Sequence, residues 1–231
     1  MPLYRYVKSV GTGKSKKSVV LSYVFMATGV LILVWTMWPI VAFSALSAQL
    51  EKTVSPVSDG IVVTKPKQSL LGSNDFQNPN TWFPTRPQKK VTAGVNTYTV
   101  SIPKLKIKDA LVTIAGDDLA VSLVHYGGTP LPGQYGNTVI FGHSTLPQFY
   151  SSTNYKTIFS FLPTMKIGDE IMIHFDTMDY RYIVYDMVVV EPTDLSPLEQ
   201  KFDDAYVTLV TCVPPGTYWK RLNIKARLAK L

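Results

Sequence analysis

One uncharged segment constrains the fold of this chain more than any other feature. Residues 19–50 carry no charged side chain, and residues 19–43 are strongly apolar. A helix needs about 20 apolar residues to cross the hydrocarbon core of a bilayer, so the segment predicts one N-terminal transmembrane helix. Trp35 and Trp38 suit a membrane–water interface, and Pro39 is expected to kink the helix or to mark its outer end. Because the apolar region of a cleaved signal peptide has only about 7–15 residues, we favour an uncleaved signal anchor.

The charges on either side of this segment predict its orientation. Five basic residues precede it, and the first acidic residue is Glu51. The positive-inside rule therefore places the N-terminus in the cytoplasm and everything after residue 50 outside, in a single-pass protein of the cell membrane. Only 18 of the 23 basic residues remain beyond residue 50, against 16 acidic ones, so the net charge of +7 falls to +2 there. No basic patch remains that would indicate binding to nucleic acid.

The chain is expected to have four parts. Residues 1–18 form a basic cytoplasmic N-terminus, 19–46 the transmembrane signal anchor, 47–95 an extracellular stalk and 96–231 a globular domain. The stalk is rich in Pro, Ser, Asn, Gln and Lys, which predicts an extended linker. Trp82 and Phe83 are expected to dock it onto the domain.

The globular domain is expected to be mainly β. Short runs rich in Val, Ile and Tyr, most of them separated by Gly, Pro or Asp, predict strands at 98–102, 110–114, 138–141, 170–175, 180–190, 206–211 and 223–228. Only residues 118–124 and parts of 155–166 have a helical pattern. Seven or eight strands with little helix predict a closed or nearly closed β-barrel with short helices.

Cys212 is the only cysteine of the chain, and it ends an apolar, β-branched run that begins at Thr208. An unpaired cysteine in an extracellular domain is a liability, an intermolecular link or a reactive thiol. It can also be a buried small hydrophobe, and composition alone does not separate these readings. Arg221 follows nine positions later, at the start of the next predicted strand. A lone thiol at a strand end, facing a fixed cation across a short loop, favours a nucleophile.

Three histidines are available as partners for the thiol. His174 alternates with apolar residues, which indicates a residue on the surface of a strand. His125 is interpreted as a packing or loop residue. His143 follows Gly142 at the end of a buried strand, a placement that mirrors that of Cys212. Cys212, His143 and Arg221 therefore form a candidate nucleophilic constellation.

Several motifs in this order, behind a signal anchor, resemble the sortase family, the membrane-anchored cysteine transpeptidases of bacterial surfaces. The resemblance covers roughly residues 97–231. The motifs are Ile102-Pro103, Gly128-Thr-Pro-Leu-Pro-Gly133, Gly136-Asn137, Gly142-His143, Gly168-Asp169 and Thr208-Leu-Val-Thr-Cys212. Arg221 lies where several sortase classes place their arginine.

The resemblance implies a closed eight-stranded sortase-type β-barrel and a cysteine–histidine–arginine active site. Cys212 would be the nucleophile, His143 the general acid and base, and Arg221 the group that stabilises the substrate carbonyl or oxyanion. The implied substrates are surface proteins with a Leu-Pro-x-Thr-Gly-like sorting signal, cleaved through a thioester acyl-enzyme. The implied acceptor is an amine on a cell-wall precursor or a pilin lysine. Thr211 would help to orient the substrate, or would be an ordinary strand residue.

Other cations compete with Arg221 for its role. Lys220 is adjacent, and Lys225 lies at a spacing that some sortases use for their arginine. A lysine lacks the planar fork of a guanidinium, so Arg221 is preferred. Arg227 is in phase with Arg221 but lies six residues further along the strand.

Some features depart from the family pattern. No second membrane segment follows the domain, unlike in many pilin-polymerising sortases. The stretch Asn78-Pro-Asn-Thr-Trp82 resembles the Asp-Pro-aromatic lid of those enzymes only weakly. The segment 192–205 carries Asp194, Glu199, Asp203 and Asp204. Such acids bind a cation in some calcium-stimulated sortases, but no ligand spacing is visible here, which favours a solvated acidic loop. We therefore expect no cofactor and leave the sortase class open.

Two further readings stay open. A hydrolytic cysteine peptidase on the same scaffold would use water in place of the amine, which leaves no sequence motif. A non-catalytic, membrane-tethered β-domain would leave Cys212 unreactive.

Overall fold

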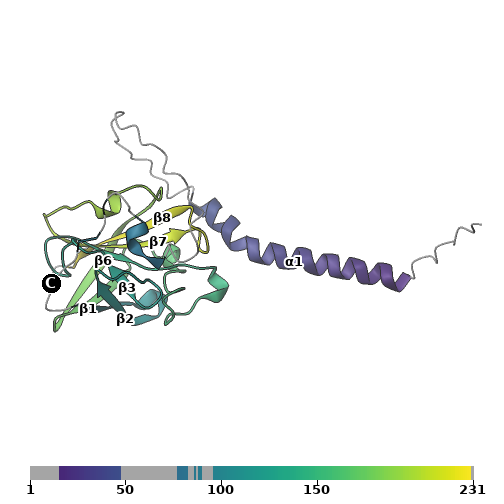
Figure 1. Cartoon of the computed structure of the whole chain (residues 1–231), viewed down its shortest axis with the longest axis horizontal. Helices are drawn as coiled ribbons and strands as arrows, with labels where there is room; N and C mark the ends of the chain where they lie inside the picture. The colour runs from purple at the N-terminus through teal and green to yellow at the C-terminus, as the bar shows by residue number, and fades with distance from the viewer. Residues whose placement is uncertain (1–15, 48–76, 83–85, 87, 90–95, 230–231) are drawn as a thin grey trace, which may run out of the picture.

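The structure is a computed structural model that describes residues 16–47, 77–82, 86, 88–89 and 96–229 (Figure 1). Within these residues the chain consists of one long helix, α1 (Lys16–Ser47), and a β-barrel. The predicted cytoplasmic residues 1–15 and most of the predicted stalk lie outside the described residues.

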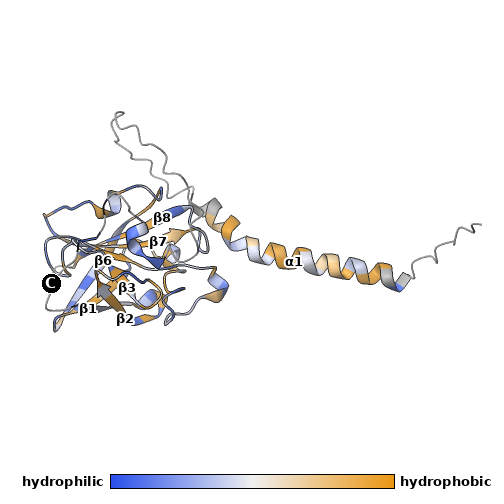
Figure 2. Ribbon diagram, viewed as in Figure 1, coloured by the Kyte–Doolittle hydropathy of each residue, from blue (hydrophilic) through white to orange (hydrophobic). Residues whose placement is uncertain are grey.

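Helix α1 contains a stretch, Val19–Phe43, that is long and apolar enough to cross a membrane. Figure 2 shows apolar residues along its whole length, and most of their side chains are exposed in the isolated chain. A helix that is apolar all round needs an apolar environment, as the sequence predicted. Pro39 lies inside α1, which continues to Ser47, so the alternative in which Pro39 ends the helix is wrong, and the kink stays a prediction.

Eight strands form a closed barrel in the order β1-β2-β3-β4-β7-β8-β6-β5. Closure pairs every strand on both edges and leaves no free edge. The strands are β1 (Thr97–Ile102), β2 (Ile107–Ile114), β3 (Leu123–His125), β4 (Gly136–Phe141), β5 (Glu170–Phe175), β6 (Met178–Val190), β7 (Ala205–Val213) and β8 (Lys220–Leu228). Short 3₁₀ helices connect them: η3 (Pro103–Leu105), η4 (Pro147–Phe149), η5 (Leu162–Thr164) and η6 (Ser196–Leu198); η2 (Pro79–Thr81) precedes the barrel. The predicted closed eight-stranded barrel is confirmed.

The seven predicted strands are all present, and the eighth, β3, was predicted as part of a helix. The prediction of a helix at 118–124 is wrong, because a turn at 119–121 leads into β3. Strand β3 pairs parallel with β2 and antiparallel with β4. Leu123 and Val124 are both fully buried, on opposite faces, so pairing and burial on both sides decide the conformation here. Residues 155–161 form turns, and only η5 is helical in the second predicted segment.

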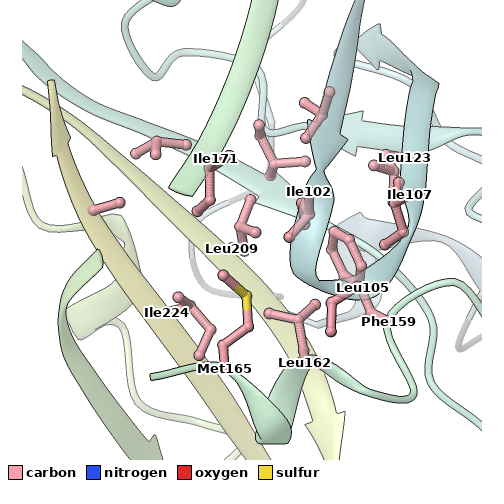
Figure 3. Packing of buried hydrophobic residues seen from close by; sticks show 14 of the residues in the cluster. Ile102, Leu105, Ile107, Leu123, Phe159, Leu162, Met165, Ile171, Leu209 and Ile224 are labelled. Carbon is pink, nitrogen blue, oxygen red and sulfur yellow. The ribbon is translucent and has the colours of Figure 1, made fainter. Parts of the chain in front are cut away.

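The main core fills the barrel. Figure 3 shows side chains from β1, β2, β3, β5, β7 and β8 meeting inside it. Phe159, Leu162 and Met165 come from the connection between β4 and β5 and join the same cluster. Leu222 and Ile224 of β8 also belong to this core. Because side chains alternate along a strand, Arg221 and Asn223 point to the outer face of the barrel.

A second apolar cluster covers the outer face of β4 and β7. Strand residues of this cluster are Val124, Val139, Phe141, Val210 and Cys212, and residues from outside the strands that pack on them are Trp82, Leu119, Tyr126, Leu195 and Leu198. Strand β7 is consequently buried on both faces, and all nine of its residues are buried. The predicted functional residues lie in this outer layer.

Candidate active site

Cys212 lies near the end of β7, which is the middle strand of the wall formed by β4, β7 and β8. Its thiol points outward with the second apolar cluster, and only 1% of the residue is exposed. A buried free cysteine on a core face would suit a structural role equally well. The surroundings of the thiol therefore decide its chemistry.

Arg221 lies directly opposite Cys212 in the antiparallel pair of β7 and β8. Residues opposite each other in such a pair have Cβ atoms about 5 Å apart, on the same face of the sheet. Nη1 of Arg221 donates to the backbone carbonyls of Tyr218, at 3.3 Å, and Lys220, at 3.4 Å. Its Nε is buried without a hydrogen-bond partner among the described residues. The guanidinium is thus held beside the thiol with donor capacity to spare.

His143 follows the end of β4, which runs parallel to β7. Phe141 is paired with Val210, and the Gly142 amide donates to the carbonyl of Val210 at 3.1 Å. Continuing this register by two residues puts His143 level with Cys212, on the same outward face. The neighbouring ends of β4 and β7 therefore place His143 and Cys212 side by side on the outward face.

Gly142 fixes how closely this turn packs on the barrel. A Cβ at this position would lie 2.4 Å from the ring of Phe159 and 2.7 Å from Leu123. Real Cβ atoms do not approach other atoms so closely, so only glycine fits here. The backbone carbonyl of His143 accepts from the Phe159 amide at 3.0 Å, which anchors the next residue as well.

Two hydroxyl groups tie the end of β4 to the end of β7. Ser144 Oγ donates to the carbonyl of Cys212 at 2.6 Å, and Thr211 Oγ1 donates to the carbonyl of Gly142 at 2.8 Å. These bonds hold the histidine-bearing turn against the cysteine-bearing strand. Thr211 alternates with Cys212 and points away from the outer face. The predicted contact of Thr211 with substrate stays a prediction.

The other two histidines lie elsewhere. His125 is fully buried in β3, where Nδ1 bonds the hydroxyl of Tyr98 at 3.0 Å, and burial lowers its pKa to about 4. His174 is exposed on β5 and pairs with Asp179 at 2.7 Å. Their sequence interpretation as packing and surface residues agrees with these positions.

The competing cations lie further from Cys212 or face another way. Lys225 is opposite Thr208 and forms an ion pair with Asp186 at 3.4 Å, and Arg227 is opposite Tyr206. Lys220 alternates with Arg221 and is opposite Val213. Arg221 is therefore the cation of β8 that is placed directly across from the thiol.

Trp82 packs over His143 and Arg221 of the candidate site. The sequence predicted that Trp82 docks onto the domain, but not that it lies at the site. Its ring lies 5.4 Å from that of Phe141 and 6.3 Å from that of His143, and Arg221 Cζ is 4.6 Å from the ring centre. The last distance is that of a cation–π contact. Trp82 is 3% exposed, so the expected docking of the stalk at this residue is confirmed, whereas Phe83 lies outside the described residues.

The segment that carries Trp82 is held by its own hydrogen bonds. The Asn78 side chain accepts from the Asn80 amide at 2.9 Å, and the Trp82 amide donates to the carbonyl of Pro79 at 3.1 Å. The Leu119 amide donates to the carbonyl of Gln77 at 2.9 Å, which attaches the segment to the barrel. We call residues 77–82 the cover segment.

Burial under the cover segment keeps the thiol and the imidazole neutral. Burial raises the pKa of the Cys212 thiol, and the positive charge of Arg221 opposes that rise. Burial also lowers the pKa of His143 to about 4; Asp118 opposes that shift, whereas Lys156 adds to it. At neutral pH the covered site thus holds an uncharged thiol beside an uncharged imidazole.

Asp194, Asp203 and Asp204 of the segment 192–205 have local partners. Asp194 accepts from the Ser196 amide, and Asp203 pairs with Lys201 at 2.7 Å. Within the part of the chain that the structure describes, no group of three or more His, Cys, Asp or Glu side chains gathers to hold a metal ion. The expectation that no cofactor is needed, and the calcium alternative, stay predictions.

Comparisons with known proteins agree with the fold and the site. A Sortase domain family model matches residues 100–229. Among solved structures, a sortase D5 transpeptidase from Clostridium perfringens is 26% identical, with a TM-score of 0.51, over 61% of this chain and 83% of that one. Sortase C1 from Streptococcus suis is 31% identical, with a TM-score of 0.52, over 59% and 74%. A lid mutant of sortase A from Corynebacterium diphtheriae is 27% identical, with a TM-score of 0.51, over 66% and 77%. Comparison with curated proteins gave no match.

The described part of the chain is a closed β-barrel that carries a thiol on the outer face of its wall. Because the family model covers more than half of the chain, the chain belongs to the sortase family. In general terms it is a sortase transpeptidase, and the relatives above span sortases named A, C and D.

Proposed function

We propose that this chain cleaves a Leu-Pro-x-Thr-Gly-like sorting signal through a Cys212 thioester and transfers the surface protein to an amine. The observation that carries the proposal is the position of Arg221 directly opposite Cys212, on the face to which β4 also delivers His143. A thiol, an imidazole and a permanently charged guanidinium on one face are the groups that acyl transfer requires.

In the first half of the reaction the peptide is cleaved. The Cys212 thiol gives its proton to His143, and Sγ attacks the scissile carbonyl carbon. Negative charge develops on the carbonyl oxygen, where the Arg221 guanidinium stabilises it. The imidazolium of His143 then protonates the leaving amine as the C–N bond breaks, which leaves an acyl-enzyme thioester.

In the second half the acceptor amine attacks the thioester. His143 accepts the proton that the amine loses, the new amide bond forms, and the Cys212 sulfur leaves as thiolate. Proton return to sulfur restores the starting state. Water in place of the amine would give the free acid, which is the hydrolytic alternative.

The cover segment has to move before a peptide can reach the thiol. Cys212 is 1% exposed, and Trp82 lies over Arg221 at the position where a substrate carbonyl would approach. Moving Trp82 would also readmit solvent, which lowers the desolvation that now disfavours the thiolate. Opening of the site and activation of the thiol are thereby coupled.

The proposed layout follows the sequence. Residues 1–18 would lie in the cytoplasm, 19–46 would span the membrane, 47–95 would form the stalk, and 96–231 would act outside the cell on secreted surface proteins. Helix α1 supports this layout because Val19–Phe43 is long enough to span a bilayer, although a signal sequence would pass the same test.

The test uses the whole 231-residue chain in detergent micelles, a library of quenched pentapeptides and a small added amine. Mass spectrometry identifies the products, and Cys212→Ala is the control. We expect a cleaved peptide joined to the amine, and no product from the variant. Free acid as the only product, with or without amine, would show a hydrolase. Cleavage of no peptide, even by the Trp82→Ala chain in which the cover is weakened, would leave a non-catalytic β-domain.

A further inference from the structure

Asn223 is a buried polar residue whose side chain makes no hydrogen bond to the described residues. It lies in β8, two residues beyond Arg221, and none of its surface is exposed. Neither Nδ2 nor Oδ1 has a hydrogen-bond partner among the described residues. Buried amide groups in proteins are nearly always paired, so a side chain with both atoms unpaired calls for an explanation.

The position of Asn223 connects it with the active site. Asn223 is opposite Val210 in β7 and opposite Val188 in β6, and Val210 belongs to the outer cluster that contains Cys212. Since Leu222 and Ile224 point into the barrel, Asn223 shares the outward face with Arg221. The side-chain amide therefore lies in the wall that bears the thiol, two residues along β8 from the Arg221–Cys212 pair.

Arg221 also has a buried polar atom that makes no hydrogen bond to the described residues. Its Nε is also buried and unpartnered among the described residues. Arg221 and Asn223 thus present the buried atoms Nε, Nδ2 and Oδ1 on the same face, and none of the three has a hydrogen-bond partner in the part of the chain that the structure describes. Valines opposite Asn223 show that an apolar residue would suit the site, so folding alone does not require the amide.

We propose that Asn223 binds a main-chain amide of the peptide substrate. An asparagine side chain carries both a donor and an acceptor, and these can pair with the C=O and N–H of one residue in an extended peptide. The bond would hold the sorting signal in register against β7 and β8, while Arg221 holds the scissile carbonyl. Asn223 is a binding residue in this scheme and takes no part in proton transfer.

The inference rests on the proposed function, because it names a contact to the same peptide substrate. It differs from a structural role in what it predicts. A merely structural asparagine would change stability when replaced, with no dependence on the substrate backbone. A binding asparagine would change the response to particular changes in that backbone.

The experiment compares the whole chain with Asn223→Val and Asn223→Ala, using a cleaved peptide and its single-ester analogues. Each analogue replaces one amide N–H outside the scissile bond by oxygen, which removes one donor and weakens one acceptor. We expect Asn223→Val to fold at least as stably as the original chain, because it removes two unpaired polar atoms from a buried strand position. We expect kcat/KM to fall at least tenfold, mainly through a higher KM.

The ester series supplies the decisive comparison. One ester position should lower kcat/KM in the original chain and have little further effect in either Asn223 variant, because the bond it removes is already gone. Lys225→Leu is the matched control, since Lys225 lies two residues further along the same face and is already paired with Asp186. It should keep kcat/KM within about twofold of the original value, a smaller change than the loss of a hydrogen bond to the substrate would cause.

Two outcomes would overturn the inference. Either an unchanged kcat/KM in folded Asn223→Val and Asn223→Ala, or ester effects that are equal in all chains, would show that Asn223 does not touch the substrate. Failure of the original chain to cleave any peptide would instead refute the proposed function, and the inference with it.

Discussion

Gly142 is the single residue on which the spacing of the site depends most directly. Its missing side chain lets the turn after β4 pack on Phe159 and Leu123, and this packing sets the place of His143. The sequence indicated a close backbone approach here, and the structure identifies the neighbours.

Gly142→Ala is therefore expected to lower the free energy of unfolding by about 1–3 kcal/mol, the usual range for overpacking a core. It should also lower transpeptidation, because His143 would move with the turn. Denaturant unfolding of the whole chain measures the first effect. Gly29→Ala is the control, since a Cβ on Gly29 meets nothing within 4 Å. Equal unfolding midpoints for Gly142→Ala and the original chain would contradict this account.

Arg221 is expected to favour the Cys212 thiolate as well as the oxyanion. Its charge already opposes the effect of burial on the pKa of the thiol. Arg221→Ala should therefore raise the pKa of Cys212 and move the pH dependence of its alkylation by iodoacetamide to higher pH. Because only thiolate reacts, alkylation at neutral pH should become slower.

The control for this prediction is Arg227→Ala, which removes a cation of the same strand that lies opposite Tyr206 instead of Cys212. It should leave the pH profile of alkylation unchanged. An Arg221→Ala profile that moved to lower pH would show that Arg221 acts on the thiol mainly by covering it.

At the scale of elements, the cover segment decides whether the site is accessible. Trp82 contacts the ring of Phe141 and the guanidinium of Arg221, while η2 and the Leu119–Gln77 hydrogen bond hold it in place. A single large side chain therefore covers Phe141 and Arg221 within the same outer layer as Cys212.

Trp82→Ala is expected to speed alkylation of Cys212 at neutral pH by at least tenfold. Two effects act in the same direction: the thiol becomes exposed, and reduced desolvation lowers its pKa. Rates of iodoacetamide labelling of the whole chain measure the change. Trp219→Ala is the control, since Trp219 is already 62% exposed. Equal rates for Trp82→Ala and the original chain would mean that other elements shield the thiol.

At the scale of the whole molecule, the single cysteine makes membrane topology measurable. Cys212 is the only thiol among 231 residues, so a labelled chain reports the location of one known site. The proposed layout puts this site outside the cell while α1 holds the chain in the membrane.

A membrane-impermeant maleimide added to intact cells that express the Trp82→Ala chain should therefore label it. The labelled chain should sediment with the membranes at its full mass, because an uncleaved anchor is retained. Cys212→Ala in the same background gives the blank. Labelling only after the cells are permeabilised would place the barrel in the cytoplasm, and a shortened chain would show that the helix is a cleaved signal.

Most of the fold was predictable because its signals are local. The apolar run of α1 and the short β-branched runs of β1, β5 and β7 carry their periodicity within a few residues. The places of the three candidate residues in the fold were also predictable, since Gly142-His143 follows the end of one strand, and Cys212 and Arg221 lie near the ends of two others. Strand β3 was missed because its three residues are extended only through pairing with β2 and β4.

By itself the sequence determined the apolar helix and the mainly β barrel, and it selected Cys212, His143 and Arg221 as candidates. Local periodicity and position at strand ends are sufficient for such inferences. Only the tertiary structure decided that Trp82 lies over both His143 and Arg221, and that the Asn223 amide has no hydrogen-bond partner among the described residues. These facts depend on contacts between segments far apart in the chain, and the burial that those contacts produce sets the protonation of the thiol and the imidazole.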